Sequence, residues 1–173
     1  MGKSVRRSTH SPVNQYWNGR HRFEHWYVSN QVYFITARTR DRAGTFRSEE
    51  AKQIFWDRFE HYTKQNDFVP WICSLVDNHY HVLGYLRKAE GLPMLMQRLH
   101  GSVAKLVNDT LEERHLPFWS EKKGKEYFDG CIRSEKQCRR ACRYTLLQGV
   151  QTAACDVGKS TVTRGSTLMW TAG

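Results

Sequence analysis

VPWICSLVDNHYHVLGYL, residues 69–86, contains two apolar segments joined by the dipeptide Asp77-Asn78. Residues 69–76 and 79–86 are rich in aliphatic, β-branched and aromatic side chains bounded by turn-forming residues, a composition that favours strands. A two-residue link is the commonest connection of a tight β-hairpin. The stretch therefore predicts an antiparallel hairpin that turns at Asp77 and Asn78.

The segments on either side of the hairpin supply one more strand before it, one after it and three helices. Ser48 can cap the first helix, Ser134 and Gln137 form a capping-box pattern, and Gly149 is a natural helix stop. In chain order the patterns predict a strand at 32–40, a helix at 48–66, the hairpin, a helix at about 91–114, a strand at 127–133 and a helix at 134–148. This order indicates an α+β fold of the split βαβ type, with an antiparallel sheet of about four to five strands and helices on one face.

The two ends of the chain differ in composition from the middle. Residues 1–26 are basic and polar, which predicts a loosely ordered arm, and residues 151–173 have little periodicity, which predicts a poorly ordered tail. Residues 27–150 between them predict one domain. No apolar run approaches the roughly 18–20 residues of a membrane span, and no signal-peptide pattern is present, so we expect a cytoplasmic protein.

The charge balance favours a polyanionic partner. The 173 residues include 27 Lys and Arg against 17 Asp and Glu, a formal net charge of +10. Nucleic acid is the simplest such partner, and a basic enzyme with a well-solvated surface is the alternative. The five cysteines are an odd number, which argues against a disulfide framework. Cys131, Cys138 and Cys142 could bind zinc, but small core residues are the favoured interpretation.

His79 and His81 stand two residues apart in the second strand of the hairpin. Side chains at this spacing point to the same face of a strand, with Cα atoms roughly 7 Å apart. Two ring nitrogens at that separation can converge on one metal ion. Packed or exposed histidines without a metal role are the alternative.

Tyr144 and Gln148 are four residues apart on the last helix and share one helical face. This helix is either a solvated basic helix with a half-buried tyrosine, or a phosphate-facing helix with a phenol nucleophile and an oxygen ligand. A tyrosine can attack a phosphodiester, and a divalent metal, Mg²⁺ or Mn²⁺, would polarise the phosphate. The candidate DNA contacts are basic or amide residues: Arg133, Arg139, Arg140 and Arg143 near or on this helix, and Lys105 and Asn108 on the preceding one.

Three motifs together resemble the single-tyrosine transposases of the HUH nuclease superfamily, and among them the REP-associated tyrosine transposases. The motifs are DNHYHVLGYL at 77–86, VYFITARTRDR at 32–42 and CRRACRYTLLQGV at 138–150, and the resemblance runs from about Phe23 to Val150. It implies a ferredoxin-like sheet, metal binding by His79, His81 and Gln148, and Tyr144 as the nucleophile. Many members have Asn followed by Pro-Val where this chain has LLQGV. Tyr80 is bulkier than the usual aliphatic residue and should face away from the metal.

The resemblance also implies a function. Such enzymes are metal-dependent endonucleases and strand transferases that act on single-stranded DNA, often beside hairpins of repetitive palindromic elements. They form a 5′-phosphotyrosine and rejoin strands, as monomers or homodimers associated with the nucleoid. The alternative is a domesticated relative that binds a nucleic-acid hairpin without cutting it. A relaxase or replication initiator of the same superfamily usually carries extra domains.

Overall fold

The computed structural model describes residues 27–121, 126–156 and 168–170. The predicted basic arm at residues 1–26 lies outside the described residues, and so does much of the predicted tail. The boundary of the arm stays a prediction, whereas a helix and a short strand include residues 151–156 and 168–170 of the predicted tail.

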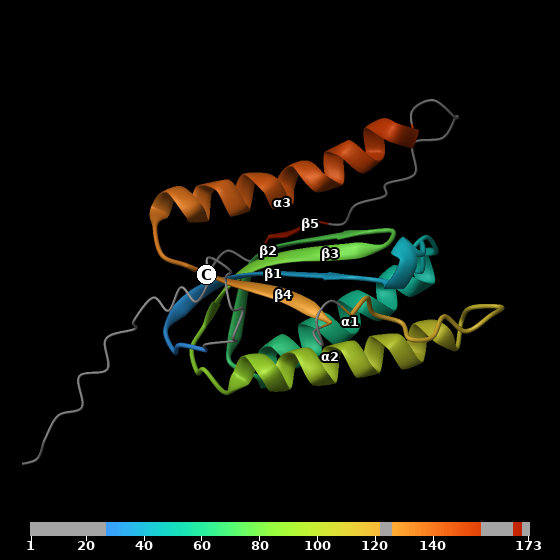
Figure 1. Ribbon diagram of the computed structural model, residues 1–173, viewed down its shortest axis with the longest axis horizontal. Coiled ribbons are helices and arrows are strands. Elements are labelled where there is room, and N and C mark those ends of the chain that lie inside the picture. Colours follow the sequence, from blue (N-terminus) through green and yellow to red (C-terminus); the bar gives the residue numbers. More distant parts are fainter. Residues whose placement is uncertain (1–26, 122–125, 157–167, 171–173) are drawn as a thin grey trace, which may run out of the picture.

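One five-stranded antiparallel sheet forms the centre of the molecule (Figure 1), with strand order β4-β1-β3-β2-β5. Strand β3 lies between β1 and β2, which is the split βαβ arrangement, so the predicted α+β, ferredoxin-like fold is confirmed. The elements in chain order are β1 (Gln31–Arg38), a 3₁₀ turn (Arg40–Arg42), α1 (Glu49–Gln65), β2 (Phe68–Val76), β3 (His79–Leu86), α2 (Gly91–Asn108), β4 (Tyr127–Ile132), α3 (Glu135–Asp156) and β5 (Leu168–Trp170).

The β2–β3 hairpin has the predicted register. Val76 pairs with His79, so Asp77 and Asn78 alone make the turn. The pairing of β3 with β1 places His79 opposite Arg38 and His81 opposite Thr36. Because directly paired residues point to the same face of a sheet, this register gathers the two histidines and their β1 partners on one side.

Helices α1 and α2 cover the other face of the sheet and enclose the main core with it (Figure 1). Tyr80 lies at its centre with no exposed surface, and its hydroxyl is 2.9 Å from His100 Nε2. The prediction that Tyr80 points away from His79 and His81 is therefore confirmed. Burial of a side chain of this size stabilises a fold by about 1.5–3 kcal/mol, so Tyr80 anchors the strand that carries both histidines.

The expectation that all helices lie on one face is wrong for α3. This helix packs against β2, β3 and β4 from the side opposite α1 and α2 (Figure 1). The reason is a second apolar cluster, in which Ile72 and Leu83 of the sheet pack with Ala141 of α3. Cys138 and Cys142 pack against this cluster, in agreement with a core role for these two thiols.

Two helix ends differ from the prediction. Helix α2 ends at Asn108 instead of near residue 114, because the Asn108 amide oxygen accepts a hydrogen bond from the His115 N–H at 2.6 Å and so holds the following loop. Helix α3 continues through Gly149 to Asp156. The predicted caps are confirmed, since Ser48 Oγ accepts from the Ala51 N–H and Ser134 Oγ accepts from the Gln137 N–H.

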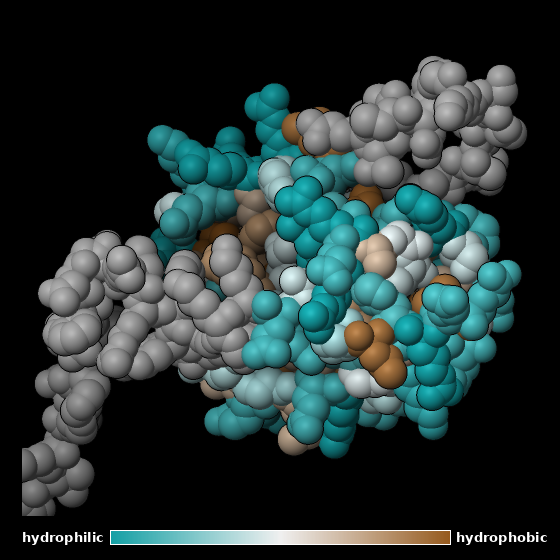
Figure 2. All heavy atoms as spheres, turned by 45° about the vertical axis from the view of Figure 1, so that its right-hand side comes forward, coloured by the Kyte–Doolittle hydropathy of each residue, from teal (hydrophilic) through white to brown (hydrophobic). Residues whose placement is uncertain are grey.

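The side of the molecule in Figure 2 is largely hydrophilic, with apolar atoms in small patches. In the described part of the chain, none of the helices combines the length and the apolar character needed to span a bilayer.

Candidate active site

His81 lies on the face of the sheet that α3 covers, where Phe34 and Thr36 hold its ring in place. Its ring is 3% exposed and stacks on Phe34, with ring centroids 5.6 Å apart and planes 9° apart. Thr36 Oγ1 lies 2.7 Å from His81 Nδ1. The other ring nitrogen, Nε2, is buried and has no hydrogen-bond partner among the described residues. When Nδ1–H donates to Thr36, Nε2 keeps a lone pair that is free to bind an ion.

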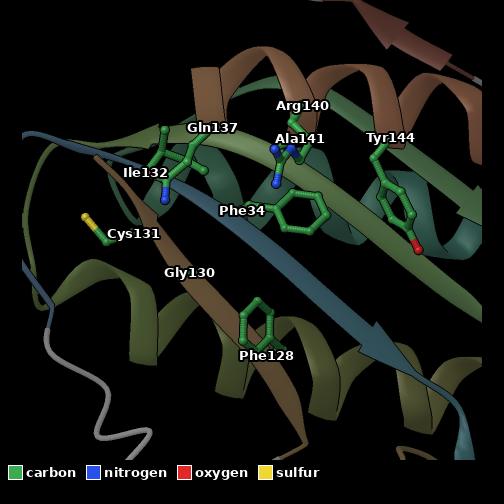
Figure 3. Close-up of a pocket in the computed structure, with 9 residues that line it drawn as sticks. All are labelled: Phe34, Phe128, Gly130, Cys131, Ile132, Gln137, Arg140, Ala141 and Tyr144. Carbon is green, nitrogen blue, oxygen red and sulfur yellow. The ribbon is translucent and has the colours of Figure 1, made fainter. Parts of the chain in front are cut away.

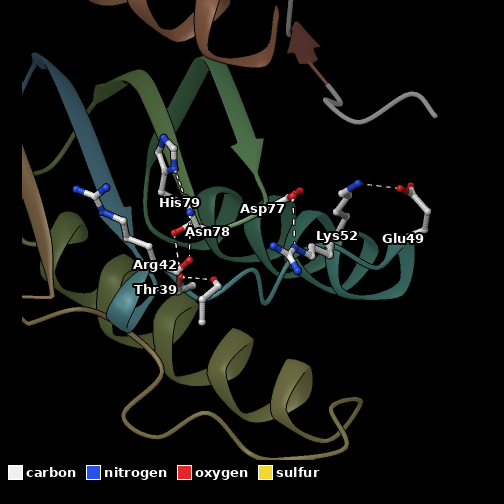
Figure 4. Close-up of polar contacts among 9 residues, drawn as sticks. Thr39, Arg42, Glu49, Lys52, Asp77, Asn78 and His79 are labelled. Atoms are coloured by element: carbon white, nitrogen blue, oxygen red, sulfur yellow. Dashed lines mark hydrogen bonds and ion pairs between the residues drawn. The ribbon is translucent and has the colours of Figure 1, made fainter. Parts of the chain in front are cut away.

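His79 is oriented by its neighbour in the turn (Figure 4). Asn78 Nδ2 donates to the Arg42 carbonyl at 3.2 Å, which leaves Asn78 Oδ1 facing His79 Nδ1 at 2.7 Å. Because an amide oxygen only accepts, His79 Nδ1 carries the proton and Nε2 has the lone pair. The 3₁₀ turn that offers this carbonyl has left-handed φ angles of 54° at Asp41 and 57° at Arg42. Asn78 thus acts as an outer-shell partner that fixes the imidazole tautomer.

Both histidines are neutral at physiological pH. Burial lowers the pKa of His79 to about 4, with the Arg38 charge as the next cause. Burial, then the neighbouring His79 and the Arg38 charge, lower the pKa of His81 to about 3. Only a neutral imidazole offers a lone pair to a metal, so the site favours the protonation state that a ligand needs. The two ring centroids are 4.8 Å apart, close enough for one ion to contact both.

Tyr144 reaches this site from α3 (Figure 3). Its ring centroid is 5.0 Å from that of His81, and the two planes are 76° apart. Phe34 also contacts the tyrosine ring edge to face, at 6.1 Å. Tyr144 is 46% exposed, so a substrate can reach it from the solvent.

Gln148 lies one helical turn after Tyr144, and its side chain hydrogen bonds with His79, a contact that raises the pKa of that imidazole. The structure thus brings together the four residues that the sequence singled out: His79, His81, Tyr144 and Gln148.

These side chains fit a divalent metal ion. Two imidazole nitrogens and one amide oxygen would supply three ligands to such an ion, and water and phosphate oxygens could supply the others. The unpartnered His81 Nε2 is the observation that most favours an ion, because a buried polar atom without a partner costs stability. No group of three or more His, Cys, Asp or Glu residues gathers in the described residues, so a site here depends on the Gln148 amide.

The cations nearest the histidines are Arg38 and Arg42, whose charges lower the pKa of His79. The sequence reasoning missed both as site residues. Arg38 becomes a neighbour of His79 only through the β1–β3 register, which sets the two residues opposite each other.

The six predicted DNA contacts divide between the two sides of the sheet. Arg133, Arg139, Arg140 and Arg143 are exposed on or beside α3. Lys105 is exposed on α2, which lies across the sheet from α3 (Figure 1). Asn108 is 5% exposed and its amide bonds to both backbone groups of His115, so it is engaged within the fold.

The fold is shared with solved transposases. The chain is similar to a REP-associated tyrosine transposase solved with a REP hairpin, at 13% identity and a TM-score of 0.61 over 89% of this chain and 93% of that one. It is also similar to a protein from Deinococcus radiodurans described as a putative transposase, at 18% identity and a TM-score of 0.50 over 70% and 93% of the two chains. No protein-family model and no curated protein match the sequence significantly. At these identities the likeness establishes the fold, which is the fold that the resemblance implied.

Proposed function

We propose that this protein is a metal-dependent transposase that nicks and rejoins single-stranded DNA through Tyr144. The observation that carries the proposal is the position of the Tyr144 ring, 5.0 Å from a buried, neutral histidine whose Nε2 has no partner among the described residues. A phenol beside such a donor set suits nucleophilic attack on a phosphodiester. The fold shared with a solved tyrosine transposase supports this chemistry.

The proposed reaction exchanges one phosphoester bond for another. The Tyr144 oxygen attacks the scissile phosphorus, the bond from phosphorus to the 3′ oxygen breaks, and a 5′-phosphotyrosine and a free 3′-hydroxyl result. The phenol gives up its proton and the departing 3′ oxygen takes one. Rejoining is the reverse, with a 3′-hydroxyl as the attacking group and the tyrosine as the leaving group.

The chain's own residues position this chemistry. His79, His81 and Gln148 would hold the divalent ion, which supplies charge that polarises the phosphate. Thr36 and Asn78 fix the orientation of the two imidazoles. The positive charges of Arg38 and Arg42 next to His79 favour the approach of a phosphate backbone.

The proposed substrate is single-stranded DNA beside a hairpin. The related solved transposase is bound to a REP hairpin, and this chain carries a net charge of +10 that suits a nucleic-acid partner. The proposed ligand is therefore a DNA hairpin with a single-stranded flank. The protein would bind it as a monomer or a homodimer.

The proposal is tested by trapping the covalent intermediate. End-labelled DNA hairpins with single-stranded flanks are incubated with the protein and Mn²⁺, then denatured and separated by size. We expect a protein–DNA adduct that survives denaturation and disappears with EDTA. Binding without any adduct in the presence of Mn²⁺ would instead identify a non-catalytic hairpin-binding protein.

Gln148→Leu should raise the Mn²⁺ concentration needed for half-maximal adduct formation by about 10-fold or more, a size typical of perturbed metal sites. Leucine keeps the volume and the helix propensity but lacks the amide oxygen, so thermal stability should change little. Titration of Mn²⁺ in the adduct assay measures the shift. The matched control is Gln97→Leu, an exposed glutamine on α2 across the sheet. An unchanged Mn²⁺ requirement would remove Gln148 from the ligand set.

A further inference from the structure

A hollow of about 380 Å³ lies between α3 and the β1–β4 side of the sheet, directly beside Tyr144 (Figure 3). Its main walls are three aromatic rings, one aliphatic side chain, one arginine and one glycine: Phe34, Phe128, Tyr144, Ile132, Arg140 and Gly130. The volume falls in the lower part of the roughly 300–1,000 Å³ range of small-molecule sites. This size suits a single planar ring system with its sugar.

Gly130 opens the hollow. It pairs with Phe34 in the β1–β4 register. On this face of β4 Gly130 lies between Phe128 and Ile132, and unlike them it has no side chain to fill the space. A Cβ added at Gly130 would lie 3.4 Å and 3.5 Å from two atoms of the Phe128 ring. A small side chain therefore fits the backbone, but a larger one would occupy the space between the aromatic rings.

The aromatic walls are open to solvent to an unusual degree. Phe128 is 47% exposed and Tyr144 is 46% exposed, although rings of this size usually contribute to cores. Among the described residues that line the hollow, Arg140 supplies a positive charge and no carboxylate is present. Aromatic faces combined with arginine are the means by which proteins stack unpaired bases and attract the attached phosphates.

We propose that this hollow, the Phe128 pocket, holds one unstacked nucleobase of the single-stranded DNA next to the phosphate that Tyr144 attacks. The proposal rests on the proposed function for the position of that phosphate. Tyr144 is itself one of the residues that line the pocket, so a base held there fixes which phosphate reaches the nucleophile. Base stacking on an aromatic ring tolerates any base, because every base has a π face.

The test measures binding, base by base, without cleavage. The probe is a fluorescent DNA hairpin with an all-thymidine flank on either its 5′ or its 3′ side, and one flank position at a time is replaced by an abasic nucleotide. Affinity is read by fluorescence anisotropy in EDTA. For the wild type we expect one flank position at which the abasic nucleotide weakens binding by about 5- to 100-fold, the size of one lost stacking contact.

Two variants assign that position to the pocket. Gly130→Val fills the hollow with a residue that favours strands, and Phe128→Leu removes an exposed aromatic face at similar volume. Both should lose the position-specific abasic penalty. Gly101→Val is the matched control, since this glycine on α2 has no atom near its added Cβ and valine is no worse than glycine in a helix. If Gly130→Val does not fold, as judged by circular dichroism, Phe128→Leu carries the test.

The outcomes separate this inference from the proposed function. Equal penalties along the whole flank, or an unchanged profile in a folded Gly130→Val or in Phe128→Leu, would overturn the base pocket even when the wild type forms its covalent adduct. A position-specific penalty that both pocket variants lose would support the pocket even when no adduct forms with Mn²⁺. In that case the proposed strand transfer fails alone.

Discussion

Replacement of Tyr144 by phenylalanine is expected to abolish the covalent protein–DNA adduct while leaving hairpin binding nearly unchanged. The phenol oxygen is the proposed nucleophile, and loss of a nucleophile costs an enzyme on the order of 10⁶-fold in rate. The phenylalanine ring keeps the edge contacts with His81 and Phe34, at 5.0 Å and 6.1 Å, so the site geometry should persist. The exposed hydroxyl contributes little to the core, and thermal stability should stay close to that of the wild type.

The measurement compares adduct yield and affinity in the same preparations. Tyr85→Phe is the matched control, because Tyr85 lies on the same face of β3 and its hydroxyl donates to Asn30 Oδ1 at 2.8 Å, remote from the site. This control should form the adduct at the wild-type rate. An adduct that still forms in Tyr144→Phe would show that another residue is the nucleophile.

Local periodicity was sufficient to pair the four central residues two by two, whereas the convergence of the two pairs was implied only by the family resemblance. The strand period of two puts His79 and His81 on one face, and the helix period of 3.6 puts Tyr144 and Gln148 on one face. The turn at Asp77 and Asn78 fixes which face the histidines occupy. Both periods act within a single strand or helix and do not depend on how the elements pack, so the structure agrees with them.

Local periodicity does not predict which strands pair or which face of the sheet a helix covers. Thr36 and Arg38 become partners of the histidines only through the β1–β3 register, which depends on residues more than 40 positions apart. The side of the sheet that α3 covers depends on the second apolar cluster around Ile72 and Leu83. The strands have apolar residues on both faces, so either face could receive a helix. The sequence pattern alone therefore did not show that α3 covers the opposite face from α1 and α2.

The outer-shell role of Asn78 was a missed signal of another kind. Asn78 was predicted only as a turn residue, and the structure shows that its side chain also joins His79 to the Arg42 carbonyl. An asparagine directly before a histidine pair can therefore indicate an orienting contact as well as a turn. The hollow beside Tyr144 had a similar faint signal, the glycine at position 130 within a strand.

His81→Ala is expected to eliminate metal-dependent adduct formation and to weaken Mn²⁺ binding by at least about 100-fold, because it removes the most constrained of the three proposed ligands. It should also reduce the free energy of unfolding by about 2 kcal/mol. His81 is 3% exposed and stacks on Phe34, so alanine leaves a cavity and deprives the Thr36 hydroxyl of its partner. Calorimetric Mn²⁺ titration and thermal unfolding measure the two effects separately.

Thr36→Val distinguishes a metal site from a merely structural histidine. Valine matches the shape of threonine and leaves the His81 ring in place, but it removes the oxygen 2.7 Å from Nδ1 that orients the ring. If Nε2 binds an ion, loss of this outer-shell partner should weaken Mn²⁺ binding by about 10- to 100-fold. If His81 is only a packed core residue, Thr36→Val should lower stability alone. Unchanged Mn²⁺ affinity in both Thr36→Val and His81→Ala would therefore rule out His81 as a ligand and leave its unpartnered nitrogen to be explained by packing.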